Sequence, residues 1–193
     1  MSRVLTRLLP FLAGATIIGL AGPAVAADLG LHDPRGDMWR QDEVGATTRA
    51  PASRQGDVVA AHVNVGTAAV VVSSRYADLA RAGRYANYTV RLQSGRHLTR
   101  EVTIETGPGD WRGSVRVFRG NGDLAPHCHP GHQIDYAANT VRITVPATCL
   151  ERPVYVRANL NSSRANARGT FFLDDPQNRK AGASRWTHWI HRG

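Results

Sequence analysis

Alternation of apolar and polar side chains is the dominant pattern along this chain. It is clearest in the C-terminal half, where Val141, Ile143 and Val145 fall on one side of an extended backbone and the polar residues between them fall on the other. Such a period of two predicts a strand with one buried face. Residues 134–136 alternate in the same phase, and the short turn at residues 137–139 joins both segments into a β-hairpin.

The same alternation recurs at nearly even spacing through the middle of the chain. Glycine-containing turns at residues 94–96, 107–110 and 120–122 separate the strands, and no segment carries a long stripe of helical period. Residues 68–74 are almost all apolar or β-branched, which predicts a central strand covered on both faces. About eight strands result, and they favour an all-β fold, an antiparallel β-sandwich of the immunoglobulin or jelly-roll kind. The expected strands span residues 58–65, 68–74, 85–92, 98–104, 111–118, 134–136, 140–145 and 154–160.

This alternation is confined to residues 57–161, which we expect to form the core of the sandwich. Residues 28–56 are rich in Gly, Pro, Asp and Arg, and they predict an irregular acidic lead-in with one short strand near Val44. Residues 162–193 lose the periodicity and predict a basic, aromatic C-terminal tail. Residues 1–27 combine a basic start, an apolar run and an Ala-x-Ala site, as a cleavable signal peptide does. We therefore expect a secreted, extracellular protein with no transmembrane span in the mature chain.

Positive charge is the second feature that bears on function. The chain carries 24 Lys and Arg against 15 Asp and Glu, a formal net charge of +9. Two arginines and no acidic residue lie in the expected signal peptide, so its removal lowers the charge by two, to +7. A basic extracellular domain attracts acidic polymers, which makes a glycan or other anionic cell-envelope material the expected partner. No motif for specific nucleic-acid recognition is present, and the oligomeric state is open.

Cys128 and Cys149 are the two cysteines of the chain. In an exported protein the economical interpretation is one disulfide bond between them. The bond would close a loop of about twenty residues and, in the chain-entropy view, stabilise the fold by roughly 3 kcal/mol. We expect it to fasten the hairpin of residues 133–146 to the turn before the next strand.

Three histidines lie close to the first cysteine. His127, His129 and His132, with the Cys128 thiol, form a set of donors suited to a transition metal. Under this interpretation the protein is a metal-dependent hydrolase. The alternative is a polar loop beside a disulfide bond, which removes the sulfur from the donor set.

Acidic residues gather before and at the start of the first regular strand. Asp33, Asp37, Asp42 and Glu43 precede Asp57, which opens that strand. Carboxylates on an irregular loop suit calcium, which takes about six to eight flexible oxygen ligands. The alternative interpretation is that they are solvated turn residues that cap backbone N–H groups.

A family resemblance begins in the same stretch. Asp-Pro-Arg-Gly-Asp at residues 33–37, Gly-Asp-Val at a strand opening and Arg-Tyr-Ala-Asp-Leu at residues 75–79 resemble the start of DOMON domains and family 9 carbohydrate-binding modules. Together with Ile-Asp-Tyr, Val-Pro and Cys-Leu later in the chain, this start is also similar to uncharacterised secreted actinobacterial β-sandwich proteins over most of the mature chain. The first resemblance covers residues 33–79. It implies a β-sandwich that binds carbohydrate and holds a structural calcium ion, with three candidate ligands: Asp33, Asp37 and Asp57.

The C-terminal tail holds a second candidate site. Trp186 and Trp189, with Arg185 and His188, form an aromatic and basic cluster that suits stacking on a sugar ring or contact with an anionic surface. Under this interpretation these four residues bind the ligand. The alternative is that the tryptophans fold back and cover an open face or edge of the sheet.

Motifs of common enzymes are not found in the chain. It has no Gly-x-Ser-x-Gly, no His-Glu-x-x-His and no phosphate-binding glycine loop before a helix. Glu101 and Glu105 lie on the outward face of one expected strand, where we expect them to pair with arginines across the sheet. The sequence thus favours a secreted, non-catalytic β-sandwich that binds an extracellular polymer, with calcium as the expected structural cofactor. The alternatives are the metal-dependent hydrolase and a purely structural or protein-partner role.

Overall fold

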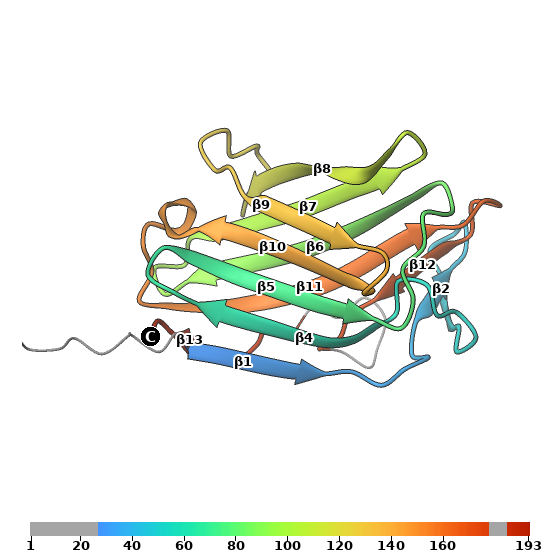
Figure 1. The fold of residues 1–193 in the computed structure, drawn as a ribbon, viewed down its shortest axis with the longest axis horizontal. Coiled ribbons are helices and arrows are strands. Elements are labelled where there is room, and N and C mark those ends of the chain that lie inside the picture. The colour runs from blue at the N-terminus through green and yellow to red at the C-terminus, as the bar shows by residue number, and fades with distance from the viewer. Residues whose placement is uncertain (1–26, 178–184) are drawn as a thin grey trace, which may run out of the picture.

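The computed structural model describes residues 27–177 and 185–193 and has an all-β fold. Two antiparallel sheets pack face to face as a sandwich (Figure 1), which confirms the predicted fold class. The helical element among the described residues is one short 3-10 helix, η1 (Ala147–Leu150). Within the described ranges no helix has the length and apolar character needed to cross a membrane. The predicted signal peptide lies outside the described residues, except for Ala27.

The smaller sheet has five strands. They are β1 (Ala27–His32), β4 (Val58–Val65), β5 (Ala69–Tyr76), β9 (Gly131–Asp135) and β10 (Thr140–Pro146). Their order across the sheet is β1-β4-β5-β10-β9. The pairing of β9 with β10 confirms the hairpin predicted around residues 137–139. The central strand is β5, as predicted, but only its alternate residues are buried, so the expectation that both of its faces are covered is wrong.

The larger sheet has eight strands. They are β2 (Trp39–Gln41), β3 (Thr47–Arg49), β6 (Tyr85–Ser94), β7 (Thr99–Gly107), β8 (Asp110–Arg119), β11 (Tyr155–Ala165), β12 (Phe171–Asp174) and β13 (Ile190–His191). The order is β3-β2-β12-β11-β6-β7-β8, and β13 pairs with β11. In Figure 1, β2 and β12 lie at one end of the sandwich and β13 lies toward the other end.

Alternate residues of the two sheets meet between the layers and form the core. Val63 and Val72 of the smaller sheet and Val90, Ile104 and Leu160 of the larger sheet are each at most 3% exposed. Removal of this apolar surface from water is the main force that holds the layers together. The polar residues between them face outward, so the outer face of each sheet is available for other functions.

The segments outside the predicted core contain more regular structure than the sequence indicated. Residues 28–56 hold β1, β2 and β3 in place of one short strand near Val44, and Val44 itself lies in a turn and is 89% exposed. The described part of residues 162–193 also holds strands, because β11 runs on to Ala165 and β12 and β13 follow. Partners distant in sequence stabilise the added strands, as in the pairings of β1 with β4 and of β12 with β2.

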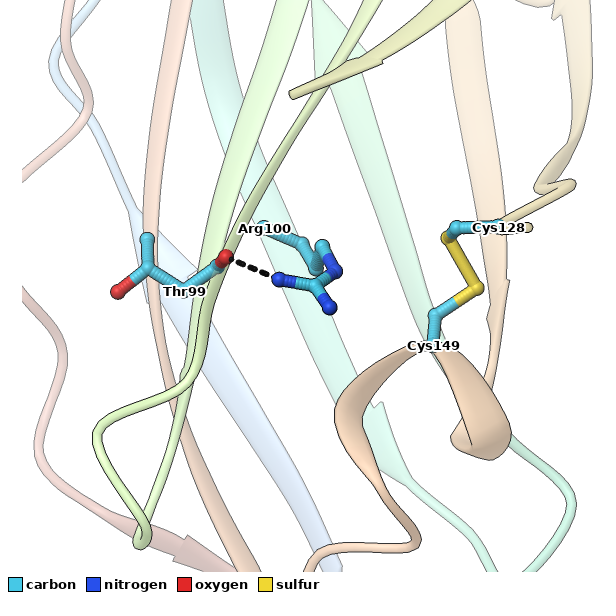
Figure 2. Close-up of a disulfide and its surroundings, with 4 residues drawn as sticks. All are labelled: Thr99, Arg100, Cys128 and Cys149. Atoms are coloured by element: carbon cyan, nitrogen blue, oxygen red, sulfur yellow. Dashed lines mark hydrogen bonds between the residues drawn. A yellow bond between two sulfur atoms is a disulfide. The ribbon is translucent and has the colours of Figure 1, made fainter. Parts of the chain in front are cut away.

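The predicted disulfide bond between Cys128 and Cys149 is present. Both cysteines are buried, and Cys149 lies in η1 directly after β10. Figure 2 shows the bond next to the start of β7, where Arg100 donates from Nη1 to the Thr99 carbonyl oxygen at 2.9 Å. The bond joins the chain before β9 to the turn after β10, so it closes the β9–β10 hairpin onto the core.

Candidate functional site

Four aspartates from three separate segments meet at the end of the sandwich that holds β2 and β12. Asp33 and Asp37 follow β1, Asp57 directly precedes β4, and Asp174 is the last residue of β12. The carboxylate oxygens that Asp33, Asp37 and Asp174 present lie within 4.8 Å of one another. We refer to these four residues as the aspartate cluster.

Backbone hydrogen bonds fix the positions of two of these carboxylates. Asp57 Oδ2 accepts the Gly36 N–H at 2.9 Å, and Asp174 Oδ2 accepts the Val58 N–H at 2.6 Å. Gly36 has a φ of 76°, and a Cβ built on it would lie 2.9 Å from the Pro51 carbonyl oxygen, so only glycine fits this turn. The cluster is therefore held by the lead-in turn and by the strand pairs on either side of it.

The ionised form of the aspartate cluster is electrostatically unfavourable. Burial is the main cause that raises the pKa of Asp33 to about 8, and the negative charges of Asp174, Asp37 and Asp57 contribute to the same rise. Burial also raises the pKa of Asp174 to about 7, although the hydrogen bond from the Val58 N–H opposes the shift. Like charges in a buried position repel each other with little solvent screening. Without a cation, the cluster therefore resists ionisation near neutral pH.

Buried oxygens of Asp33 and Asp57 lack a hydrogen-bond donor. Asp33 Oδ2 and Asp57 Oδ1 are buried and have no hydrogen-bond partner among the described residues. Asp57 as a whole is 0% exposed. In the described part of the chain, the ion pairs include neither of these residues nor Asp174. A buried carboxylate oxygen without a partner is costly, so these atoms are candidates to ligate a metal ion.

Three members of the cluster were candidate calcium ligands on the sequence. The structure places Asp33 and Asp37 in the converging group with Asp174, whereas Asp57 lies outside that group and is hydrogen-bonded to the Gly36 N–H. Asp33, Asp37 and Asp57 were expected, and the calcium itself stays a prediction. Asp174 was not singled out, because nothing in its local sequence connects it to the lead-in. The connection is the pairing of β12 with β2 and the hydrogen bond to Val58, which lies 116 residues away.

The second candidate site lies on the outer face of the larger sheet. The Arg157 guanidinium lies 5.0 Å from the Trp186 ring and 4.8 Å from the Trp189 ring, and the Arg91 guanidinium lies 5.5 Å from the Trp186 ring. Arg157 also donates from Nε and Nη2 to Gln93 Oε1, at 2.8 and 2.6 Å. We refer to Arg91, Arg157, Trp186 and Trp189 as the arginine–tryptophan platform.

The backbone of the tail covers the edge of β11, while the indoles of the tail lie outside. Thr187 donates its N–H to the Ala158 carbonyl oxygen at 2.8 Å, its Oγ1 accepts the Ala158 N–H at 2.9 Å, and Ile190 is buried in the core. Trp189 is 37% exposed and packs edge to face against Tyr155. The backbone of the tail and Ile190 thus cover the edge, and the tryptophans lie over arginines of the sheet's outer face, while ligand binding by the tail stays a prediction.

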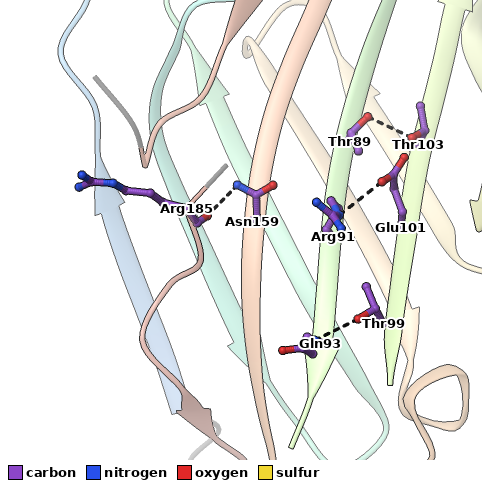
Figure 3. A network of polar contacts seen from close by, with 8 residues as sticks. All are labelled: Thr89, Arg91, Gln93, Thr99, Glu101, Thr103, Asn159 and Arg185. Carbon is purple, nitrogen blue, oxygen red and sulfur yellow. Dashed lines mark hydrogen bonds and ion pairs between the residues drawn. The ribbon is translucent and has the colours of Figure 1, made fainter. Parts of the chain in front are cut away.

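The other two expected ligand residues do not join the platform. Arg185 and His188 are exposed, and Asn159 Nδ2 donates to the Arg185 carbonyl oxygen at 2.7 Å. Figure 3 shows the Arg185 side chain directed away from the face of the sheet. Arg157, which was not predicted from the sequence, is the basic residue beside the tryptophans. The alternation of residues 154–160 was a signal for it, because it places Arg157 on the outward face of the strand.

A polar surface continues from the platform across β6 and β7. Figure 3 shows its cross-strand pairs: Thr89 with Thr103, Arg91 with Glu101 and Gln93 with Thr99. The Arg91–Glu101 pair at 3.5 Å and the Arg116–Glu105 pair at 3.1 Å confirm the predicted cross-strand pairing of both glutamates. Next to the platform, a shallow hollow is lined by Arg91, Thr99, Glu101, Phe118 and Arg119.

The histidine loop does not form a convergent donor set. His127 and His129 are exposed, and His132 Nε2 lies 3.0 Å from the Arg112 carbonyl oxygen. Cys128 is in the disulfide bond. Among the described residues, the group of three or more converging donors consists of aspartates, so the geometry does not favour the hydrolase interpretation at this loop.

Comparisons with protein-family profiles, with curated proteins and with solved structures find no match to this chain.

Proposed function

We propose that this protein is a secreted, non-catalytic β-sandwich module that binds an acidic extracellular polysaccharide at the arginine–tryptophan platform. The observation that carries the proposal is Arg157, a guanidinium placed between two partly exposed indoles. Arg157 takes part in none of the ion pairs found among the described residues. Its positive charge is therefore available to an anionic ligand.

The chemistry of the platform supports a sugar acid as the ligand. A guanidinium has five N–H donors and recognises carboxylates through parallel hydrogen bonds. Gln93 occupies two groups of Arg157, Nε and Nη2, which leaves donors for a ligand. The indole of Trp189 offers an apolar surface beside this charge, and tryptophan combines stacking area with a polar edge. A uronic acid unit presents the matching features, a ring face and a carboxylate.

The surroundings of the platform support an extended polymer. Threonine, glutamine and asparagine side chains line the adjoining outer face of β6, β7 and β11, and they can exchange hydrogen bonds with sugar hydroxyls. Glu101, the carboxylate next to the platform, is paired with Arg91. This pairing favours a role in binding over a role in acid–base catalysis. The net positive charge of the chain attracts an acidic polymer to this surface.

The test is affinity electrophoresis and calorimetry with polygalacturonate as the acidic polymer and dextran as the neutral one. We expect the wild type to bind polygalacturonate, with affinity that falls as salt rises, and to bind dextran far more weakly. Arg157→Gln should weaken binding about tenfold, because a charge-assisted hydrogen bond contributes about 1.5–3 kcal/mol. The matched control is Arg142→Gln, which removes the same charge from the exposed face of β10 on the other sheet.

Two outcomes would contradict the proposal. Equal loss of affinity in Arg142→Gln and Arg157→Gln would mean that net charge alone drives binding. Equal affinity for dextran and polygalacturonate would exclude an acidic ligand class.

A further inference from the structure

We propose that Asp33, Asp37, Asp57 and Asp174 together hold one calcium ion, which joins the lead-in after β1 to the end of β12. This site is separate from the platform, and it does not depend on the proposed polysaccharide ligand.

The spacing of the carboxylates fits one calcium ion. Calcium–oxygen distances are about 2.3–2.6 Å, so two ligands on opposite sides of one ion lie about 4.6–5.2 Å apart. The oxygens that Asp33, Asp37 and Asp174 present lie within 4.8 Å of one another. They therefore lie close enough to share a single ion.

An independent feature, the buried side chain of Asp57, points to a cation. Asp57 is 0% exposed, and its Oδ2 is held by the Gly36 N–H while its Oδ1 has no partner among the described residues. Asp57 interacts electrostatically with Asp33, Asp37 and Asp174, so its charge lies near the three carboxylates whose oxygens converge. A folded protein rarely leaves such an atom without a partner, and a metal ion would supply one.

The donor set selects calcium over transition metals. Every member of the cluster is a carboxylate, and the converging group contains no histidine or cysteine. Hard oxygen ligands suit calcium and magnesium, whereas nitrogen and sulfur ligands suit zinc and copper. Magnesium demands a tight octahedron with several bound waters, while four carboxylates from three separate segments form the irregular, oxygen-rich shell that calcium accepts.

The ion would bind together three parts of the chain that are far apart in sequence. Asp33 and Asp37 come from the lead-in, Asp57 from the start of β4 and Asp174 from the end of β12. β12 belongs to the larger sheet, and β4 belongs to the smaller one. Calcium at this position would therefore join the two sheets at one end, as the disulfide bond joins the segment before β9 to η1 elsewhere in the sandwich.

The experiment combines metal analysis with thermal melting of the full mature protein. Chelator-treated protein is melted alone and with about 5 mM calcium, which exceeds the dissociation constants of roughly 10⁻⁴–10⁻³ M that are typical of extracellular calcium sites. We expect one calcium per chain and a rise in melting temperature of at least about 5 °C, since a ligand that binds only the folded state stabilises it. Magnesium at the same concentration should produce a clearly smaller rise.

Asp33→Asn is the decisive variant, because Asp33 makes no hydrogen bond through the oxygen that it would give to the ion. It should melt in chelator within about 2 °C of the wild type or above it, and it should lose most of the shift produced by calcium. Asp174→Asn should lose the shift too, while its amide oxygen can still accept the Val58 N–H. The matched control is Asp123→Asn, which removes one exposed carboxylate in the β8–β9 connection and should keep the full shift.

Three results would overturn the calcium site. They are the absence of a calcium-induced shift in the wild type, a shift of equal size in Asp33→Asn, and equal stabilisation by magnesium. Each readout is independent of polymer binding, so failure of the platform proposal leaves this test unchanged.

Discussion

The ionisation of the carboxylates in the aspartate cluster is subject to two opposing effects. The Gly36 and Val58 N–H groups hold Asp57 and Asp174 in place, and both hydrogen bonds favour the ionised carboxylates. Burial and mutual repulsion favour the protonated form, and the raised pKa values of Asp33 and Asp174 mean that burial dominates in the metal-free protein. A divalent cation changes this balance, because its attraction for four carboxylates exceeds their repulsion for each other.

The stability of the metal-free protein should therefore fall as pH rises. The ordinary pKa of an aspartate is 3.8, and in the folded chain it is about 8 for Asp33 and about 7 for Asp174. Between pH 4 and pH 8 the folded state thus binds more protons than the unfolded state, and its stabilisation is lost as the pH approaches these folded values. We expect the melting temperature of chelator-treated protein to decrease by several degrees from about pH 5 to about pH 8.

Calcium should remove or reverse this trend, since it binds the ionised carboxylates. Melting curves at four or five pH values, with calcium and with chelator, check the prediction. In chelator, Asp33→Asn should show a shallower dependence than the wild type. A metal-free melting temperature that stays constant or rises over this range would contradict the assignment of the cluster.

Trp189 and Ile190 are neighbours at the start of β13, but their side chains have different roles. Ile190 is 6% exposed and belongs to the core, whereas Trp189 is 37% exposed and lies against Arg157. Ile190 points into the sandwich because the strand pairs with Tyr155 and Val156 of β11, and alternation then turns Trp189 outward.

Substitution of these neighbours should separate stability from binding. Ile190→Ala should lower the free energy of unfolding by about 2–4 kcal/mol, the usual range for removal of a buried aliphatic side chain. Trp189→Ala should cost about 1 kcal/mol or less, because its ring is partly exposed, and it should weaken binding to polygalacturonate. Urea unfolding and calorimetry on both variants check this. A larger loss of stability in Trp189→Ala than in Ile190→Ala would show that the indole mainly covers the sheet.

The elements that could be predicted are those whose own residues carry the signal. β6 and β10 alternate in burial along their full length, and glycine-containing turns follow β6 and β7, so the positions of these strands follow from local pattern. β2 and β3 have three residues each and β12 has four, too few for a period to emerge. β2 and β12 form because they pair with each other across a long stretch of sequence, and β3 then pairs with β2; Asp174 was missed for the same reason. Arg157 differs, since its outward phase was visible but the indoles that flank it became apparent only in three dimensions.

At the scale of the whole molecule, the aspartate cluster and the platform are connected through consecutive residues at the end of β12. Asp175 follows Asp174 directly. Burial raises the pKa of Asp175 to about 6, and a hydrogen bond from the Asn159 side chain opposes this rise. Asn159 also donates to the Arg185 carbonyl oxygen, next to Trp186 of the platform. Gln177 binds the backbone of β11 at Ala158 and Leu160. The end of β12 is thus fixed to the strand that carries Arg157.

Calcium should therefore strengthen polysaccharide binding, provided that both proposals hold. An ion on Asp174 would order the end of β12 and, through Asn159, the start of the tail, so that less conformational entropy is lost when the polymer binds. We expect calcium to increase the affinity for polygalacturonate about fivefold in the wild type, which is within the usual range of coupling between two sites. The affinity of Asp33→Asn should not change with calcium.

The same comparison excludes calcium bridges between protein and polymer, because such bridges would persist in Asp33→Asn. By linkage, the polymer must raise calcium affinity by the same factor, which calorimetry can measure independently. Identical affinities with calcium and with chelator would show that the two sites act separately and that the β12–Asn159–Arg185 connection transmits no coupling.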